Sequence, residues 1–392
     1  MGNFILLFLK GRTLCCGLCF FLLAGCSQVR QLSDVFVKPT PREKYARNFA
    51  QDSTKFQSWI QAFKRSLQDS ISVALPYSEM ITFPDRFPFA YSYDVQLNQG
   101  ENVSIHLTTE LDSMEVFMDI FQYVASDSLL QDPVLETKYM PREASIWRVE
   151  NTGTYKIVLQ PALETYPEGR LDIFVGPTLG FPVSDVEQNA IQSFWGAPRA
   201  GGSRQHEGVD IFAPRSTPVV AVTDGRVRYV GEKGLGGKQV WFNEGVFGKS
   251  FYYAHLDSVN VSMAEKVSKG DTLGFVGNTG NARTTVPHLH FGIYTSKGAI
   301  DPLPFIKMTE RKEGELQNTL RYASVKATEG NFRMSPTTKS SQIGRLVATD
   351  TVFILGKTFG WYHMLTNQNE RGFMSASLLN EINARSPVLT VP

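Results

Sequence analysis

The chain has 392 residues, enough for two or three domains that each bury a core of their own. Its 39 basic and 38 acidic residues leave a net charge of +1, which gives no electrostatic case for a nucleic-acid partner. All four cysteines lie within the first 26 residues, so no disulfide framework can hold the folded domains.

The N-terminus has the pattern of an export signal. Lys10 and Arg12 precede an apolar run over residues 14–25, which has the length of a signal h-region and is too short to span a bilayer. The run ends in Leu-Ala-Gly before Cys26, which resembles a bacterial lipobox and predicts a lipoprotein signal peptide over residues 1–26, with Cys26 as the lipidated residue. An uncleaved anchor helix is the alternative, but Lys10 to Arg12 would interrupt it. By analogy with a bacterial sorting rule, Ser27 favours an exported protein anchored in the outer membrane and facing the periplasm.

Residues 27–76 are predicted to form a tether and a helix. Thr40, Pro41 and Glu43 supply a capping hydroxyl, a proline at the first helical position and the glutamate of a capping box. Apolar residues then recur at a helical period, at Tyr45, Phe49, Phe56, Trp59, Ile60, Phe63, Leu67 and Ile71. We expect this stripe to pack on the next domain, and a partner-binding helix is the alternative.

Residues 77–178 are predicted to form a β-sandwich. Between Phe83 and Val175 apolar and polar residues alternate with period two, and turn sequences stand at 98–100 and 151–153. About eight short strands fit this stretch. Its polar residues form no clustered site, so we interpret it as a spacer, with glycan or protein binding as the alternative.

Residues 184–306 are predicted to form an antiparallel, largely β domain, because no segment of helical period interrupts its strands. The strands are short and rich in β-branched and aromatic residues, over 219–222, 226–230, 239–242, 250–255, 272–276 and 290–294. Four of the six histidines of the chain fall in this stretch.

These histidines have the spacing of a metal site. His206 and Asp210 lie four residues apart, and His288 and His290 share one face of a strand, with His255 between them in sequence. Three nitrogen or oxygen ligands with a fourth position left to water are typical of catalytic zinc. A thiolate site is excluded here because no cysteine follows Cys26.

At these residues the chain resembles the lysostaphin and LytM-like zinc metallopeptidases of family M23, which cut peptide cross-links in bacterial cell walls. The motifs are HxxxD at His206 and Asp210, HxH at His288 and His290, and Tyr-Ala-His ending at His255. The resemblance covers about residues 190–306. It implies a groove that is floored by a sheet and walled by loops.

The resemblance also implies roles for single residues. His206, Asp210 and His290 would hold one Zn²⁺ in the peptidase domain, and His255 and His288 would be the catalytic pair in hydrolysis by zinc-activated water. Which histidine is base and which is acid stays open. Arg199 and Arg204 are weaker candidates for binding a substrate carboxylate, with solvated surface as the equal alternative. Some family members carry a tyrosine six residues before the first ligand, where this chain has Ala200.

Residues 320–382 resemble a bacterial SH3-like module, a small β-barrel that often accompanies wall hydrolases and contacts wall peptides. The similarity lies in short segments around Phe332, Gly344, Trp361 and Phe373. Trp361 and His363 are interpreted as structural residues of this module.

Taken together, the sequence predicts a mainly β fold and a membrane-anchored zinc endopeptidase that hydrolyses peptide cross-links of peptidoglycan. Its expected partners are peptidoglycan stem peptides, the membrane through lipid on Cys26, and a wall-hydrolase or regulator protein, but no nucleic acid. The alternative is an inactive or self-inhibited LytM-like lipoprotein that binds the wall and regulates another hydrolase.

Overall fold

The computed structural model describes residues 39–50, 53–109, 115–125, 128–129, 132–139, 145–245, 248–309, 314, 316–318 and 320–382. Cys26 and most of the predicted tether lie outside these residues. The chain divides after Ser53 into two compact units, and each is described by itself. The fold is mainly β, as predicted, and every strand-to-strand ladder that pairs named strands is antiparallel in the described part of the chain.

The apolar stripe predicted as a helical segment is divided between two helices, α2 (Pro41–Ala46) and α3 (Thr54–Gln68). Helix α2 begins with the predicted capping box, in which Thr40 and Glu43 each accept a hydrogen bond from the other's backbone N–H. The prediction was wrong about continuity. After α2 the N–H of Asn48 donates to the carbonyl of Tyr45 at 3.0 Å, a tight turn of the kind that asparagine favours over helix.

Helix α3 packs on the sandwich, as the apolar stripe predicted. Phe56 and Trp59 are buried, and the Trp59 indole N–H donates to the carbonyl of Pro161 at 2.8 Å. The Gln160 side-chain amide donates a hydrogen bond to the carbonyl of Trp59 at 2.8 Å, so polar groups of both the helix and the strand are hydrogen-bonded in this contact.

The sandwich consists of two antiparallel sheets over one core. One sheet contains β2 (Tyr91–Leu97), β8 (Gly153–Pro161), β4 (Val116–Ala125), β5 (Ser128–Leu129) and β6 (Leu135–Tyr139). The other contains β1 (Tyr77–Thr82), β9 (Glu168–Pro177), β3 (Glu101–Thr109) and β7 (Ser145–Arg148). The alternating apolar residues predicted to face inward, such as Val103, Ile105 and Ile157, are fully buried.

The C-terminal residues form a third antiparallel group of strands. These are β23 (Tyr322–Val325), β24 (Glu329–Arg333), β25 (Gln342–Val347), β26 (Thr351–Thr358), β27 (Trp361–Leu365), β28 (Arg371–Ser375) and β29 (Leu379–Glu381), with the 3₁₀ turn η5 (Ala376–Leu378) before the last. Buried apolar side chains, among them Phe332, Ile354 and Met364, form its own small core.

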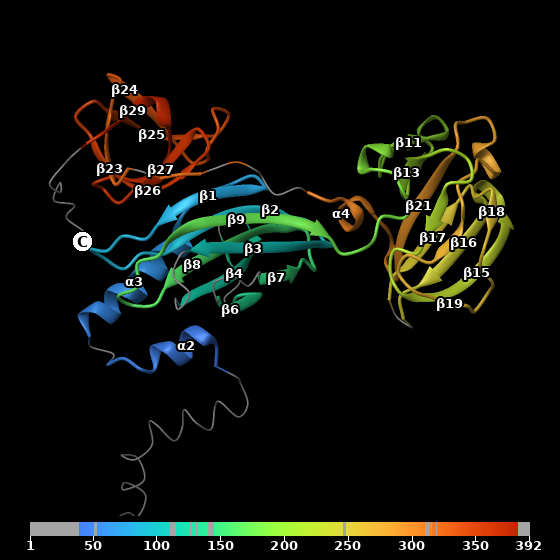
Figure 1. Cartoon of the computed structure of the whole chain (residues 1–392), viewed down its shortest axis with the longest axis horizontal. Helices are drawn as coiled ribbons and strands as arrows, with labels where there is room; N and C mark the ends of the chain where they lie inside the picture. Colours follow the sequence, from blue (N-terminus) through green and yellow to red (C-terminus); the bar gives the residue numbers. More distant parts are fainter. Residues whose placement is uncertain are drawn as a thin grey trace, which may run out of the picture. The chain divides into compact units, whose positions relative to one another are not determined.

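The C-terminal strands and the sandwich share one sheet. Strand β26 pairs with β1, with Met80 opposite Lys357 and Ile81 opposite Gly356, and the two strands run side by side in Figure 1. The sandwich core also includes Phe353, Leu355 and Phe373 from the C-terminal group. The C-terminal module is therefore part of a common hydrophobic core.

A buried carboxylate joins the two groups of strands. Glu79 on β1 is fully buried and accepts hydrogen bonds from the hydroxyls of Tyr77 and Tyr93, each at 2.7 Å. Its second oxygen lies 3.0 Å from Nδ1 of His363 on β27, which is 1% exposed. Three donors thus meet one carboxylate inside the shared core, and His363 is structural, as the sequence suggested.

We expect Glu79→Ala to lower the free energy of unfolding by about 3 kcal/mol or more, because it leaves three buried donors without an acceptor. Chemical denaturation followed by tryptophan fluorescence measures the change. The matched control is Glu329→Ala, which removes an exposed carboxylate paired with Arg345 at 3.1 Å and should cost less than about 0.5 kcal/mol. Equal losses in the two variants would contradict a special role for the buried carboxylate.

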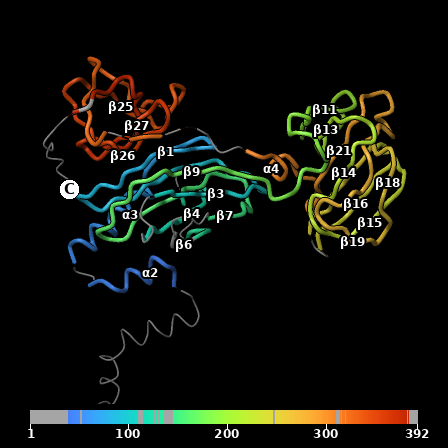
Figure 2. Tube along the Cα trace, in the orientation of Figure 1, coloured from blue at the N-terminus to red at the C-terminus, as the bar shows by residue number. Residues whose placement is uncertain are grey.

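The central domain contains the histidine-rich stretch. Its main sheet contains β10 (Ile191–Ser193), β13 (Val209–Phe212), β21 (His288–Thr295), β17 (Ser250–Ala254), β16 (Gly237–Asn243), β15 (Gly225–Lys233) and β19 (Lys266–Val267), with β22 (Gly298–Ile300) beside β21. Smaller sheets contain β14 (Pro218–Val220), β20 (Thr272–Phe275) and β18 (Ser258–Val259), and β11 (Pro198–Arg199) with β12 (Arg204–Gln205). Short turns and one helix complete it, η1 (Gln188–Ala190), η2 (Ala200–Gly202), η3 (Gly234–Gly236), η4 (Gly280–Ala282) and α4 (Leu303–Ile306). Figure 2 shows the trace of this domain from green to orange.

The main sheet of the central domain has one apolar and one open face. Phe251, Tyr253 and Phe291 point into the core and are fully buried. Their neighbours in the strands, Tyr252 and His290, point to the opposite face because successive side chains alternate. The predicted strand parity therefore places His290 on the face that can receive a ligand.

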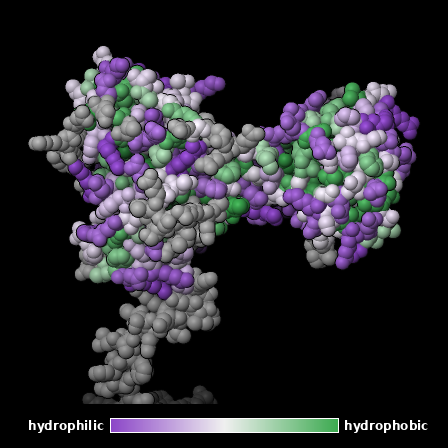
Figure 3. All heavy atoms as spheres, in the orientation of Figure 1, coloured by the Kyte–Doolittle hydropathy of each residue, from purple (hydrophilic) through white to green (hydrophobic). Residues whose placement is uncertain are grey.

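Hydrophilic side chains are interspersed with apolar ones over the face of the protein shown in Figure 3. In the part of the chain that the structure describes, the helices are all too short or too polar to cross a lipid bilayer.

Candidate active site

The predicted site residues line one open cavity of about 870 Å³ in the central domain. His206, Asp210, His255, His288 and His290 all contribute to its wall. A separate cavity of about 490 Å³ lies beside α3, but its lining contains no histidine and no aspartate. The chemistry therefore points to the cavity of the central domain.

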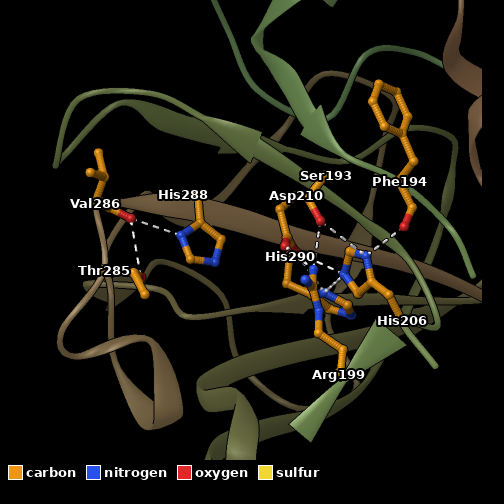
Figure 4. Close-up of polar contacts among 9 residues, drawn as sticks. All are labelled: Ser193, Phe194, Arg199, His206, Asp210, Thr285, Val286, His288 and His290. Atoms are coloured by element: carbon orange, nitrogen blue, oxygen red, sulfur yellow. Dashed lines mark hydrogen bonds and ion pairs between the residues drawn. The ribbon is translucent and has the colours of Figure 1, made fainter. Parts of the chain in front are cut away.

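Three of the predicted residues meet at a single point, as Figure 4 shows. The Nε2 atom of His206, the Nδ1 atom of His290 and the Oδ1 atom of Asp210 lie 3.0 Å from one another. These three side chains form a cluster that can hold a metal ion.

The backbone brings this cluster together. Asp210 on β13 stands directly opposite His290 on β21, although the two are eighty residues apart in sequence. His206 precedes β13, and Gly208 lets the chain pass close to β21. A β-carbon at Gly208 would lie 2.4 Å from the carbonyl oxygen of Phe291 and 2.8 Å from the His290 ring.

Hydrogen bonds fix the orientation of His206. Its Nδ1–H donates to the carbonyl oxygen of Phe194 at 2.9 Å, which leaves the lone pair of Nε2 directed at the cluster. Burial lowers the pKa of His290, so its ring is neutral at neutral pH and can also offer a lone pair.

Asp210 is held in its ionised form. Burial opposes ionisation, but the neighbouring His206 and His290 outweigh it and hold the pKa of Asp210 well below its usual value. Its second oxygen, Oδ2, accepts a hydrogen bond from Arg199 at 2.7 Å, and Arg199 also donates to Ser193 at 2.5 Å. One carboxylate oxygen thus faces the histidines while the other is held by the guanidinium.

The cluster fits zinc. A tetrahedral Zn²⁺ with bonds of 2.0–2.1 Å sets its nitrogen and oxygen ligands about 3.3 Å apart, close to the 3.0 Å separations here. Two imidazoles and one carboxylate also match the donor set of catalytic zinc, which keeps a fourth position open.

The other two histidines lie beside this cluster with matching orientations. Nδ1 of His255 donates to the carbonyl of Thr279 at 2.9 Å, and Nδ1 of His288 donates to the carbonyl of Val286 at 2.8 Å. Their ring centroids are 5.1 Å apart, and His255 lies 6.0 Å from the ring of His290. Both rings therefore keep the Nε2 lone pair available in the neutral state.

His255 stays neutral at physiological pH. Burial, followed by the neighbouring His290 and His288, lowers the pKa of His255 to about 4. Its backbone has φ = 63°, in the left-handed region that few residues other than glycine adopt. A strained backbone that is maintained next to a polar cluster is typical of functional sites.

We expect Arg199→Ala to weaken zinc binding by roughly tenfold to a hundredfold, because the hydrogen bond from Arg199 no longer orients the Asp210 carboxylate. The Arg199 side chain is 30% exposed, so water screens part of its repulsion for a cation and the orienting effect should dominate. Zinc titration against a competing chelator measures the affinity.

The control for this experiment is Arg204→Ala, because Arg204 is exposed and lines the same cavity but is not joined to Asp210. An unchanged affinity in Arg199→Ala, or an equal loss in both variants, would contradict an orienting role for Arg199.

Comparison with known proteins agrees with this geometry. Residues 204–302 match the model of peptidase family M23. The chain contains an M23 peptidase domain. At family level such domains belong to metallopeptidases that hydrolyse peptidoglycan.

The M23 domain is similar to several curated relatives. The chain is 32% identical over 145 residues to "L-Ala--D-Glu endopeptidase" of Bacillus subtilis (strain 168), a match that covers 34% of this chain and 44% of that protein. It is 37% identical over 109 residues to lysostaphin of Staphylococcus simulans, covering 26% of this chain and 21% of that protein. The chain thus spans less than half the length of these two curated relatives.

Among solved structures, the catalytic domain of lysostaphin from Staphylococcus simulans has 32% sequence identity to this chain. The match covers 30% of this chain and 92% of that chain, with a TM-score of 0.27.

The structure also shows functional contacts that the sequence did not predict. Arg199 contacts Asp210, where the sequence suggested a substrate carboxylate, while Arg204 lies exposed at the cavity wall. Ser193, Phe194, Thr279 and Val286 hold the polar side chains of the site in place. Three of these four residues act through a backbone carbonyl, and because every residue has one, the sequence could not single these three out.

Proposed function

We propose that this protein is an exported, lipid-anchored zinc endopeptidase that hydrolyses peptide cross-links of bacterial peptidoglycan. The observation that carries the proposal is the meeting of His206, Asp210 and His290 at one point, with His255 and His288 beside it in an open cavity. The M23 match supports the reaction class. The lipobox-like sequence before Cys26 supports the anchor, and Ser27 after it supports the assignment to the outer membrane by analogy with a bacterial sorting rule.

His206, Asp210 and His290 would hold the ion, one per M23 domain. A bound Zn²⁺ supplies Lewis acidity, which polarises a substrate carbonyl and lowers the pKa of water toward 7. Asp210 offsets one unit of its charge, and the two imidazoles each direct a ring nitrogen at the same point.

His255 and His288 transfer protons in the proposed reaction. Each is fixed by a backbone carbonyl at Nδ1, so Nε2 can take a proton from the attacking water or give one to the leaving amine. Once protonated, either ring can donate a hydrogen bond to the oxyanion that develops on the scissile carbonyl. The equivalent anchoring gives both rings the same tautomer, so either one can serve as base.

The C-terminal module resembles a bacterial SH3-like module in sequence, and we propose that it contacts wall peptides. In the structure its strands share a sheet with the sandwich. We infer that sandwich and module act together as one support that carries the M23 domain on its tether.

The test is digestion of purified, cross-linked peptidoglycan with the zinc-loaded protein, followed by mass spectrometry of the released muropeptides. We expect cross-linked fragments to be converted to monomers and the mass change to identify the bond that is cut. Bound zinc without any turnover would instead favour a regulatory protein that acts through another hydrolase.

A further inference from the structure

A second cavity of about 670 Å³ adjoins the candidate active site on the open face of the sheet. The two cavities share Leu235, Gly236 and Tyr252 in their walls. The Tyr252 hydroxyl packs against the Gly236 backbone where the two cavities meet, since a β-carbon at Gly236 would lie 1.9 Å from that hydroxyl. An extended ligand that lies along these shared walls reaches both cavities.

A row of aromatic side chains on three neighbouring strands runs from the second cavity toward the metal cluster. Tyr229 on β15 stands opposite Trp241 on β16, which stands opposite Tyr252 on β17. Tyr252 in turn is opposite Gly292 on β21, two residues from His290. Since neighbouring strands lie about 4.8 Å apart, the row extends roughly 14 Å from the metal cluster.

Ring contacts join this row to the metal cluster. The rings of Trp241 and Tyr252 are stacked with centroids 4.3 Å apart, and the edge of Tyr252 meets His290 at 5.6 Å. Tyr229 at the outer end is 36% exposed. A β-bulge between Val227 and Tyr229 brings this last ring into register with Trp241.

The row is held in a fixed geometry before any ligand binds. The indole N–H of Trp241 donates to the side-chain oxygen of Gln239 at 3.2 Å, and Gln239 donates to the carbonyl of Lys233 at 2.9 Å. Such preorganisation lowers the entropic cost of binding.

The charges around the second cavity have one sign. Arg228 and Lys233 line it, and no carboxylate does among the described residues. Both side chains are exposed, and neither forms an ion pair with an acidic side chain among the described residues. A ligand with a free carboxylate would complement the positive charge of this wall, whereas a neutral saccharide would form no ion pair with Arg228 or Lys233.

We propose that Tyr229, Trp241, Arg228 and Lys233 form a distal subsite that binds a carboxylate-bearing segment of the extended peptide whose scissile bond lies at the metal cluster. The inference rests on the proposed endopeptidase function for the identity of the ligand. At about 3.3 Å per residue, roughly four extended residues reach from the cluster to Tyr229. The aromatic row contacts the apolar parts of these peptide residues, and Arg228 and Lys233 favour a free carboxylate over a neutral amide.

Isothermal titration of the full chain with two synthetic peptides tests this subsite. One is Ala-Glu-Ala-Ala with free carboxyl groups, and the other is the same peptide with both carboxyls amidated. We expect the acidic peptide to bind about fivefold more tightly. The preference should disappear in the double variant Arg228→Gln, Lys233→Gln, and Trp241→Leu should weaken binding of both peptides.

Lys297→Gln is the control, because it removes a positive charge from the exposed turn between β21 and β22, outside the second cavity, and should retain the preference. Equal affinity for the two peptides in the wild type, or no binding of either, would overturn the proposal. Tighter binding of chitotetraose than of either peptide would assign the cavity to a saccharide instead. Because the measurement is binding, a protein that cleaves no wall material would still give a clear result.

Discussion

The His206→Ala variant is expected to bind zinc more than about a hundredfold more weakly than the wild type and to lose detectable hydrolysis of peptidoglycan. Only two of three ligands remain in this variant, and Asp210 loses a neighbour that holds it in place at 3.0 Å. Competition with a chromophoric chelator measures zinc affinity, and release of soluble muropeptides measures activity.

The matched control is His106→Ala on strand β3 of the sandwich, outside the cavity of the M23 domain. It removes an imidazole of the same kind, whose ring stacks on Phe174 at 5.2 Å. Its zinc affinity and activity should equal those of the wild type. Wild-type zinc affinity in His206→Ala would mean that the ion is held elsewhere, and the proposed chemistry would then fail.

The His288→Ala variant should separate catalysis from metal binding. We expect kcat to fall by about a hundredfold to ten-thousandfold, because a positioned group that transfers protons is lost. Zinc affinity should stay within about threefold of the wild type, since His288 lies outside the three atoms that meet at 3.0 Å. Steady-state kinetics and zinc titration on the same preparation measure both quantities.

His255→Ala should behave in the same way, and the double variant should lose little more than either single one if the two rings act as a unit. A parallel fall of zinc affinity and kcat in His288→Ala would show that this residue supports the metal cluster. A kcat within a few-fold of the wild type in both single variants would remove them from the reaction.

Much of the site could be predicted from local sequence patterns. The spacing of His288 and His290 fixes both on one face of a strand, because side chains alternate along an extended chain. Gly208, between His206 and Asp210, permits the close approach of β13 and β21 that the cluster needs. The six strands predicted in the central domain appear at nearly the predicted positions.

The helical segment shows where local patterns were insufficient. The apolar period continued through the residues between α2 and α3, yet the chain turns at Asn48. Periodicity records which face is apolar, but local hydrogen bonds decide whether the backbone continues as helix.

The sequence by itself determined which side chains are available for chemistry: two motifs that supply imidazoles and a carboxylate, and strands whose alternation turns them to one face. Only the tertiary structure decided how they are used. It joined Arg199 to Asp210, anchored His255 and His288 on backbone carbonyls, and buried Glu79 against His363, which is 284 residues away. The physical reason is that hydrogen bonds to the backbone and contacts across sheets depend on distance in space, and side-chain identity along the chain does not encode that distance.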